Sequence, residues 1–243
     1  MPKRLIVTVA FVLLLAPAAA FAQIRQVSSS PEASRNAVNF SIGYFGLKGI
    51  ESRDPDDVIV GDLVNQHPLL FEVNDLNGAT FGGEYLFAPT RNFEVGVGLG
   101  FSQKSIQTVY ADITHVDQSD IEQELKLRQI PVTFTGRFLI LPRGSAVEPY
   151  IGAGLTAIRY QYSEVGEFVD ADGFIFPGVF KTNGTAAGPI VLAGVRAPIE
   201  NWTVGGEFAW QKVVADVPVE DQLLGTKLDL GGWHVRFNFG VRF

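Results

Sequence analysis

Six charged residues stand in segments of the sequence that otherwise alternate between apolar and small or polar residues. They are Glu84, Glu94, Arg137, Arg196, Glu207 and Arg236. Alternate residues of a β-strand face opposite sides of the sheet, so three acids and three arginines would share one face. Because an unpaired buried charge is costly, we expect them to pair and to close the space between them. A gate or a small-solute path lined by the same residues is the alternative.

The segment 231–243 at the end of the chain has the clearest alternation. It reads GGWHVRFNFGVRF, in which the odd positions from Trp233 to Phe243 are apolar or aromatic. The even positions between them include His234, Arg236 and Arg242. In a soluble protein the face with the large apolar side chains would have to pack on a core. The opposite face, with the arginines, would have no second layer packed on it. The pattern is typical of a transmembrane β-barrel wall, with one face toward lipid and the other toward the lumen.

Seven more segments repeat this pattern and predict an all-β fold, an eight-stranded antiparallel transmembrane up-and-down β-barrel. The expected strands are 37–45, 79–87, 93–103, 122–140, 148–162, 186–198, 202–212 and 226–243. Short connections alternate with long ones, as periplasmic turns alternate with outer loops. The short connections are 88–92, 141–147 and 199–201, and the long ones are 46–78, 102–121, 163–185 and 213–225. Pro131 predicts a bulge or register change in the fourth strand, beyond which Leu125 and Leu127 would take the opposite phase.

The start of the chain has the features of a secretory signal peptide. Two basic residues precede an apolar stretch over 5–15, and Ala20-Phe21-Ala22 offers a cleavage site. The stretch is shorter than the roughly 20 residues that a transmembrane helix needs. We therefore expect a signal peptide over 1–22, a flexible polar lead-in over 23–36 and a barrel domain over 37–243, exported to a bacterial outer membrane.

Composition argues against several other classes of protein. The chain has no cysteine and three widely separated histidines, His67, His115 and His234. Neither a disulfide framework nor a thiolate or histidine metal site is therefore predicted, and no motif predicts a cofactor. The net charge of -7 argues against a nucleic-acid binder, which needs cations to neutralise phosphates. The 26 glycines and 19 phenylalanines suit a narrow barrel with an aromatic lipid face.

Two of the long connections have distinctive compositions. The first is acidic, and its carboxylates are Glu51, Asp54, Asp56, Asp57 and Asp62. They could provide solubility, a divalent-cation site near lipopolysaccharide, a cation preference at a pore mouth or a surface for a partner, although their spacing is not that of an EF-hand. The third connection is apolar, with Phe168, Phe174, Phe176 and Phe180. We expect it to pack on itself; a binding site is the alternative.

Five segments carry a family resemblance: ATFGGEYLF, FEVGVGLGF, RQIPVTFTGRF, EPYIGAGL and the terminal NFGVRF. The chain resembles the small eight-stranded bacterial outer-membrane β-barrel superfamily, which includes OmpA-like, OmpW-like and porin-family proteins. The resemblance covers nearly all of the chain after the signal peptide. It implies contact with outer-membrane lipids and lipopolysaccharide, and insertion by the barrel assembly machinery, for which Phe243 would be the recognition signal.

The resemblance leaves several functions open. It implies a structural barrel or a narrow channel for small solutes. The alternative is a surface interaction or adhesion protein that uses acidic loops on a barrel anchor, with an unknown extracellular partner. A lipid-modifying enzyme fits less well, because deacylase-type barrels carry a His-x-Ser-Asn run, whereas Val235 and Arg236 follow His234. We therefore predict no catalytic residues and no enzyme.

Overall fold

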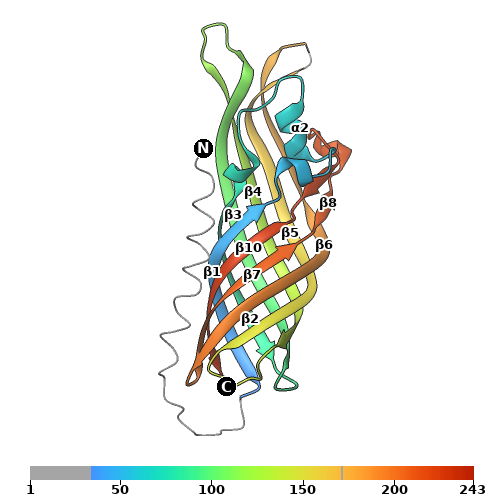
Figure 1. Ribbon diagram of the computed structural model, residues 1–243. Helices are drawn as coiled ribbons and strands as arrows, with labels where there is room; N and C mark the ends of the chain where they lie inside the picture. Colours follow the sequence, from blue (N-terminus) through green and yellow to red (C-terminus); the bar gives the residue numbers. More distant parts are fainter. Residues whose placement is uncertain (1–33, 171) are drawn as a thin grey trace. The chain divides into compact units, whose positions relative to one another are not determined.

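A closed barrel of eight antiparallel strands forms the main part of the computed structural model (Figure 1), which describes residues 34–170 and 172–243. The barrel strands are β1 (Asn36–Leu47), β2 (Gly78–Phe87), β3 (Phe93–Thr114), β4 (Asp120–Leu139), β5 (Glu148–Val169), β6 (Ile175–Ile199), β7 (Trp202–Gln211) and β10 (Gly232–Arg242). Each pairs with its neighbours in this order, and β1 closes onto β10. The predicted eight-stranded antiparallel barrel is confirmed. The predicted signal peptide and most of the lead-in lie outside the described residues.

A belt of exposed apolar side chains surrounds the part of the barrel that all eight strands share. Phe40, Phe134 and Phe239 are 53%, 60% and 43% exposed, although they lie on paired strands. Aromatic residues stand at both edges of the belt, namely Tyr85 and Trp202 near the short turns and Tyr44, Trp210 and Trp233 at the other end. Lipid accommodates such a continuous apolar surface, and aromatic girdles mark both interfaces of outer-membrane barrels. The belt confirms the lipid-facing phase predicted from the terminal strand.

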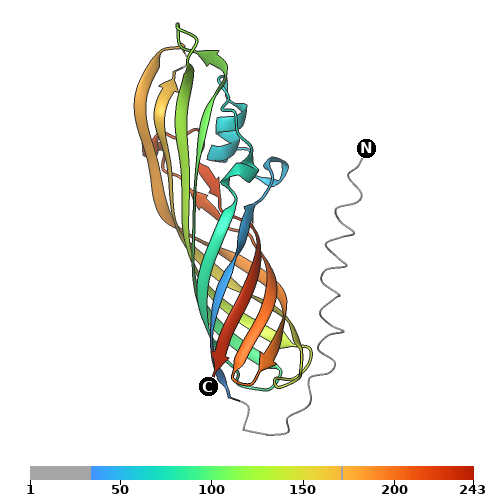
Figure 2. The same ribbon diagram turned by 90° about the vertical axis from the view of Figure 1, so that its left-hand side faces the viewer.

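Four of the strands are about twice as long as the others. Strands β3 to β6 have 20 to 25 residues, and β1, β2, β7 and β10 have 10 to 12. At about 3.3 Å per residue, the additional residues carry the long strands on the order of 30 Å beyond the short ones (Figure 2). The predicted loops over 102–121 and 163–185 are therefore wrong for most of their length. Their outward side chains are largely polar, so the apolar alternation ends while the backbone ladder continues.

Pro131 lies in β4 without changing the register of the strand. The pairing of β4 with β5 runs unbroken over their shared length, and the pairing with β3 has the same register on both sides of the proline. The predicted bulge and phase change are therefore wrong, and Leu125 and Leu127 are buried on the inward face. Gly100 supplies the room, since a Cβ there would lie 2.9 Å from the proline ring.

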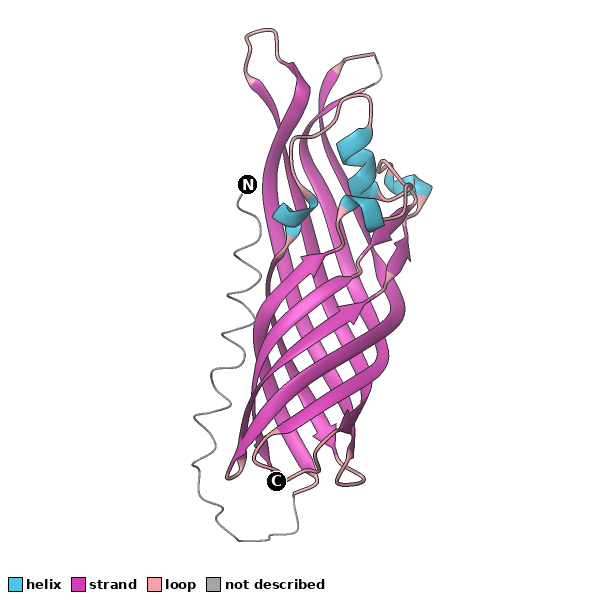
Figure 3. Ribbon diagram, viewed as in Figure 1, coloured by secondary structure: helices cyan, strands magenta, loops and turns pink. Residues whose placement is uncertain are grey.

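The long strands and two loops form a second compact part, the head, which comprises residues 48–77, 102–128, 158–170, 172–186 and 212–231. Its loops contain the short helices η2 (Ile50–Ser52), α2 (Val58–Val64), η3 (Val73–Leu76) and η4 (Val219–Asp221), and the two-stranded sheet of β8 (Val214–Asp216) and β9 (Lys227–Asp229). Figure 3 places these loop elements beyond the ends of the short strands. The short turns lie at the opposite end of the barrel. In outer-membrane barrels short turns face the periplasm and longer connections lie on the outer side.

The head has a hydrophobic core of its own. Val58 and Ile59 of α2 pack with Leu127, Ile158 and Leu228 in one buried cluster. Leu127 and Ile158 belong to the inward faces of β4 and β5, so the strands that cross the membrane also hold the loops in place. Within the described residues, the helices are too short or too polar to span a bilayer.

Candidate functional site

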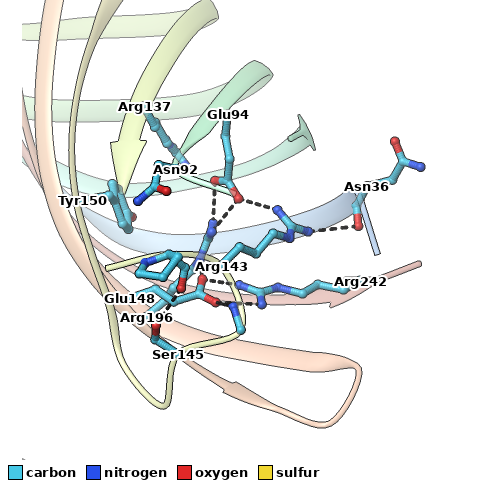
Figure 4. Close-up of polar contacts among 12 residues, drawn as sticks. Asn36, Asn92, Glu94, Arg137, Arg143, Ser145, Glu148, Tyr150, Arg196 and Arg242 are labelled. Carbon is cyan, nitrogen blue, oxygen red and sulfur yellow. Dashed lines mark hydrogen bonds and ion pairs between the residues drawn. The ribbon is translucent and has the colours of Figure 1, made fainter. Parts of the chain in front are cut away.

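Five charged side chains meet inside the barrel next to the short turns; we call them the lower cluster (Figure 4). Glu94 forms ion pairs with Arg143 and with Arg196, whose Nη2 is 2.5 Å from Glu94 Oε1. Arg196 Nε also donates to Glu148 Oε2 at 2.7 Å, and Arg242 Nη1 donates to Glu148 Oε1 at 2.9 Å. Glu94 and Glu148 are 1% and 0% exposed. The lower cluster thus joins two buried carboxylates to three guanidinium groups.

The ends of the strands position the lower cluster. Glu94 is the second residue of β3, Glu148 is the first residue of β5, and Arg242 is the last residue of β10. Glu148 and Arg196 are direct partners across β5 and β6, and side chains in that relation lie close together. Arg143 comes from the turn between β4 and β5. The strand register therefore brings acids and arginines to one level of the lumen.

A middle cluster of charges lies further from the short turns. Arg137 Nη2 donates to Glu84 Oε1 and to Glu207 Oε2, both at 2.8 Å. Arg236 Nη2 is 2.7 Å from Glu207 Oε1, and Tyr150 OH donates to Glu207 Oε2 at 3.0 Å. The guanidinium carbon of Arg137 also lies 5.0 Å from the centroid of the Tyr150 ring. Both carboxylates of the middle cluster therefore contact an arginine.

The two clusters bring together all six charged residues predicted to face the lumen, which are Glu84, Glu94, Arg137, Arg196, Glu207 and Arg236. The structure adds Arg143, Glu148 and Tyr150 to the site, and it also brings in Arg242, which the phase of the last strand had predicted to face the lumen. Arg143 lies in a turn, where alternation gives no phase. For the other three residues the sequence did contain a signal. Glu148 and Tyr150 share the even phase of the fifth strand, and Arg242 lies on the polar face of the last strand.

Little space remains in the lumen beside these charges. The cavity there measures about 30 Å³, enough for about two water molecules. Gly96 contributes to the close packing, since a Cβ at this position would lie 2.8 Å from Glu84 Oε1. Tyr150, Ile190 and Leu192 form a buried apolar group in the same part of the barrel. Side chains of the described residues therefore fill the lumen.

The acidic residues of the first loop are divided between surface and core. The exposed ones are Glu51, Asp54 and Asp56, and the buried ones are Asp57 and Asp62. Asp57 accepts a hydrogen bond from the N–H of Ile59 at 2.9 Å, which caps α2, and pairs with Arg53 at 3.0 Å. Burial raises the pKa of Asp57, although Arg53 opposes this shift. Three carboxylates of this loop thus face solvent, whereas Asp57 caps α2 and Asp62 is buried beside Tyr162.

Two buried carboxyl groups of the head face the same cavity, which measures about 310 Å³. Asp62 of α2 and Glu164 of β5 are 1% and 4% exposed, and Tyr162 OH donates to Asp62 Oδ2 at 3.1 Å. Burial raises the pKa of Glu164 to about 7. Burial and the neighbouring Glu164 raise the pKa of Asp62. Sequence reasoning missed Glu164 because it lies in a segment that was expected to be a loop.

Phe243 ends the chain against the first residue of β1. The N–H of Phe243 donates to the carbonyl of Asn36 at 3.0 Å, and the N–H of Asn36 donates to the carbonyl of Phe243 at 3.2 Å. The Phe243 side chain is 62% exposed. The residue therefore belongs to the seam that closes the barrel, and its role as a signal for the assembly machinery stays a prediction.

Comparisons with known proteins identify the architecture. No protein-family model matches the chain, and no curated protein matches it significantly. Among solved structures, the outer membrane protein OprG from Pseudomonas aeruginosa superposes with a TM-score of 0.50 at 12% identity, over 87% of this chain and 97% of that chain. The chain has the fold of the small bacterial outer-membrane β-barrels. Its apolar belt is the surface that a barrel of this fold presents to lipid.

Two further solved structures resemble the chain at lower TM-scores. Neisserial surface protein A has a TM-score of 0.48 at 13% identity, over 86% of this chain and 97% of that chain. The N-terminal β-barrel domain of Pseudomonas aeruginosa OprF has a TM-score of 0.41 at 13% identity, over 86% of this chain and 98% of that chain. At such identities the likeness concerns the fold alone.

Proposed function

We propose that this protein is a closed structural barrel of the outer membrane that anchors its extracellular head, rather than a channel for small solutes. The single observation that carries the proposal is the filled lumen: the two ion-paired clusters leave a cavity of about 30 Å³. A hydrated solute would have to displace these side chains. Breaking a buried ion pair by removing one partner costs about 3–5 kcal/mol, so the closed state has a large advantage.

Recordings in planar bilayers test this proposal. The wild-type protein should give no conductance steps, because the side chains of the described residues leave a cavity of only about 30 Å³ beside the ion pairs. A double variant, Glu207→Ala with Arg236→Ala, removes one pair and opens space beside Arg137, so brief conductance steps are expected. Lys126→Ala is a matched control on the outward face and should stay silent. Steps from the wild-type protein that Glu207→Ala alters would identify a channel instead.

A second candidate function is surface interaction through the head. It is supported by the head's own apolar core and by the long strands, which extend on the order of 30 Å beyond the ends of the short strands, at about 3.3 Å per residue. Deleting the whole first loop is a poor test, because Val58 and Ile59 are fully buried and the core would be lost. Replacing the exposed Glu51, Asp54 and Asp56 by their amides leaves the core intact. Binding to cells or envelope components should fall if these carboxylates contact a partner, and unchanged binding would contradict that role.

We also propose that the outward face of the head contacts phosphate groups of lipopolysaccharide. Four basic side chains lie on three adjacent strands just above the apolar belt: Lys126, Arg128, Arg159 and Lys181. Lys126 and Lys181 are both register partners of Ser163 in the strand pairing, so the three residues lie side by side across the sheet. A polar hollow of about 270 Å³ lies between them and includes Arg128. Guanidinium and ammonium groups form strong charge-assisted hydrogen bonds with phosphate oxygens.

A further inference from the structure

The cavity of about 310 Å³ in the head has a polar floor and an aromatic wall. Asp62, Gln123 and Glu164 contribute the polar groups. Phe168, Phe176 and Phe180 contribute aromatic rings, and the cavity opens to the outside at the head. Its volume lies at the lower end of the range for small-molecule sites, roughly 300–1,000 Å³. The cavity is therefore large enough for a small organic molecule.

The polar floor offers hydrogen-bond acceptors that lack a donor. Glu164 and Gln123 are 4% and 2% exposed, and within the described residues neither Glu164 Oε1 nor Gln123 Oε1 has a hydrogen-bond partner. The amide nitrogen of Gln123 donates to Tyr110 OH at 2.8 Å and to the carbonyl of Glu167 at 3.0 Å. These bonds fix the amide so that its oxygen is the unsatisfied atom. Buried polar groups normally have a partner, and here both groups require a donor.

The aromatic wall is ordered by its own contacts. Phe168 and Phe180 meet edge to face with centroids 4.6 Å apart, and Phe176 lies 6.0 Å from Phe168. Phe168 is 8% exposed, and the other two rings are half-buried. The faces of aromatic rings attract cations and also cover apolar groups. A ligand that is cationic at one end and apolar at the other would match both sides of the cavity.

We propose that this cavity binds a small organic ammonium ion, with its N–H groups on Glu164, Gln123 and Asp62 and its apolar body on the three phenylalanines. An ammonium group is all donor and has no acceptor, which complements a floor of oxygen acceptors. A metal ion is a poorer match, since the described residues contain no group of three or more acidic, histidine or cysteine side chains arranged to hold one. The inference depends on the folded head and is independent of whether the lumen conducts.

Calorimetric titration of the full mature protein in detergent micelles tests the inference, with 2-phenylethylammonium as the probe. The measurement is made at pH 8, because the pKa of Glu164 is about 7 and its carboxyl is then ionised. The wild-type protein should bind the amine, and Glu164→Gln should weaken binding at least tenfold. Glu124→Gln removes an exposed carboxylate from the outward face of the neighbouring strand and should leave binding unchanged.

A comparison of ligands decides the question even if the Glu164 variant fails to fold. The neutral isostere 2-phenylethanol has the same apolar body without the positive charge, and it should bind the unmodified protein at least tenfold more weakly than the amine. Equal binding of amine and alcohol, absence of amine binding up to millimolar concentration, or an unchanged affinity in a folded Glu164→Gln variant would each overturn the proposal. Conductance recordings would be unaffected by any of these results, so closure of the lumen is tested separately.

Discussion

The lumen and the head both bury carboxyl groups, but the neighbours of these groups differ in charge. In the lumen Glu84, Glu94, Glu148 and Glu207 each contact at least one arginine within 2.9 Å. In the head Asp62 and Glu164 are direct neighbours at one cavity, and the groups that act on their pKa values include hydroxyl and carboxyl groups rather than a cation. The first arrangement is electrostatically complete. The second lacks a positive charge, which a proton or a bound ammonium ion would supply.

The difference separates a stabilising role from a binding role. A paired charge network of this kind resists any change, since removal of one member leaves another charge buried and unpaired. Two neighbouring carboxyl groups repel each other when both are ionised. A cation that binds between them therefore stabilises the folded head. We therefore expect substitutions in the two regions to act with opposite sign on stability.

The largest effect is expected in the middle cluster. Glu207→Ala removes the carboxylate that Arg137 and Arg236 share, and should lower the free energy of unfolding by about 3–5 kcal/mol. Urea titration in lipid vesicles, followed by the heat-modifiable shift in gel mobility, measures the change. Asp120→Ala, at the exposed tip of β4, is the control and should change stability by no more than about 0.5 kcal/mol. A loss in Glu207→Ala as small as in the control would contradict the network's role.

A smaller effect of opposite sign is expected in the head. Burial raises the pKa of Glu164 from 4.5 to about 7, so the folded head binds a proton more tightly than the unfolded chain. Stability is then greatest below the unfolded pKa and is lost as pH rises through the folded value, by on the order of 3 kcal/mol in total. The protection factors of the α2 amides, which are exchange rates corrected for their intrinsic pH dependence, should fall between about pH 5 and pH 8.

Glu164→Gln is the decisive variant for this pH effect. It removes the titrating group and should flatten the profile of protection factor against pH, while making α2 more protected than in the wild-type protein at pH 8. Glu124→Gln is exposed on the neighbouring strand and should retain the wild-type profile. If the wild-type profile is flat, or if Glu164→Gln keeps its slope, the two carboxyl groups do not carry the pH dependence.

The smallest effect is expected on the outward face. The double variant Lys126→Gln with Arg128→Gln removes two cations from the polar hollow, each worth about 1 kcal/mol near an anionic membrane surface. Fewer lipopolysaccharide molecules should remain bound after purification, as counted by native mass spectrometry. Lys227→Gln is the control, since this lysine lies in the head loops and pairs with Asp216. Equal lipopolysaccharide retention in both variants would count against contact through this face.

The alternation of apolar residues was sufficient to predict the barrel, because one physical constraint acts along every strand that crosses the membrane. Residues that face lipid must be apolar, so Phe237 and Phe239 reveal the phase of β10, and Glu207 and Arg236 follow as inward neighbours. Beyond the membrane this constraint ends. The residues after Phe101 in β3 therefore gave no alternation of that kind, and the outer parts of the long strands, within 102–121 and 163–185, were predicted to be loops. Pro131 misled for a related reason, because the glycine that accommodates it lies on another strand.

The sequence by itself determined which side chains face lipid and which face the lumen, since the alternation of a strand is a local property. Only the tertiary structure decided which inward charges become partners. Arg143 reaches Glu94 from a turn, and Arg242 meets Glu148 across the closed ring, contacts that depend on barrel closure and strand register. The same holds for Asp62 and Glu164, which come from a helix and a strand far apart in the chain. Both are buried at one cavity because the first loop packs against the long strands. The periodicity of the strands does not predict this packing.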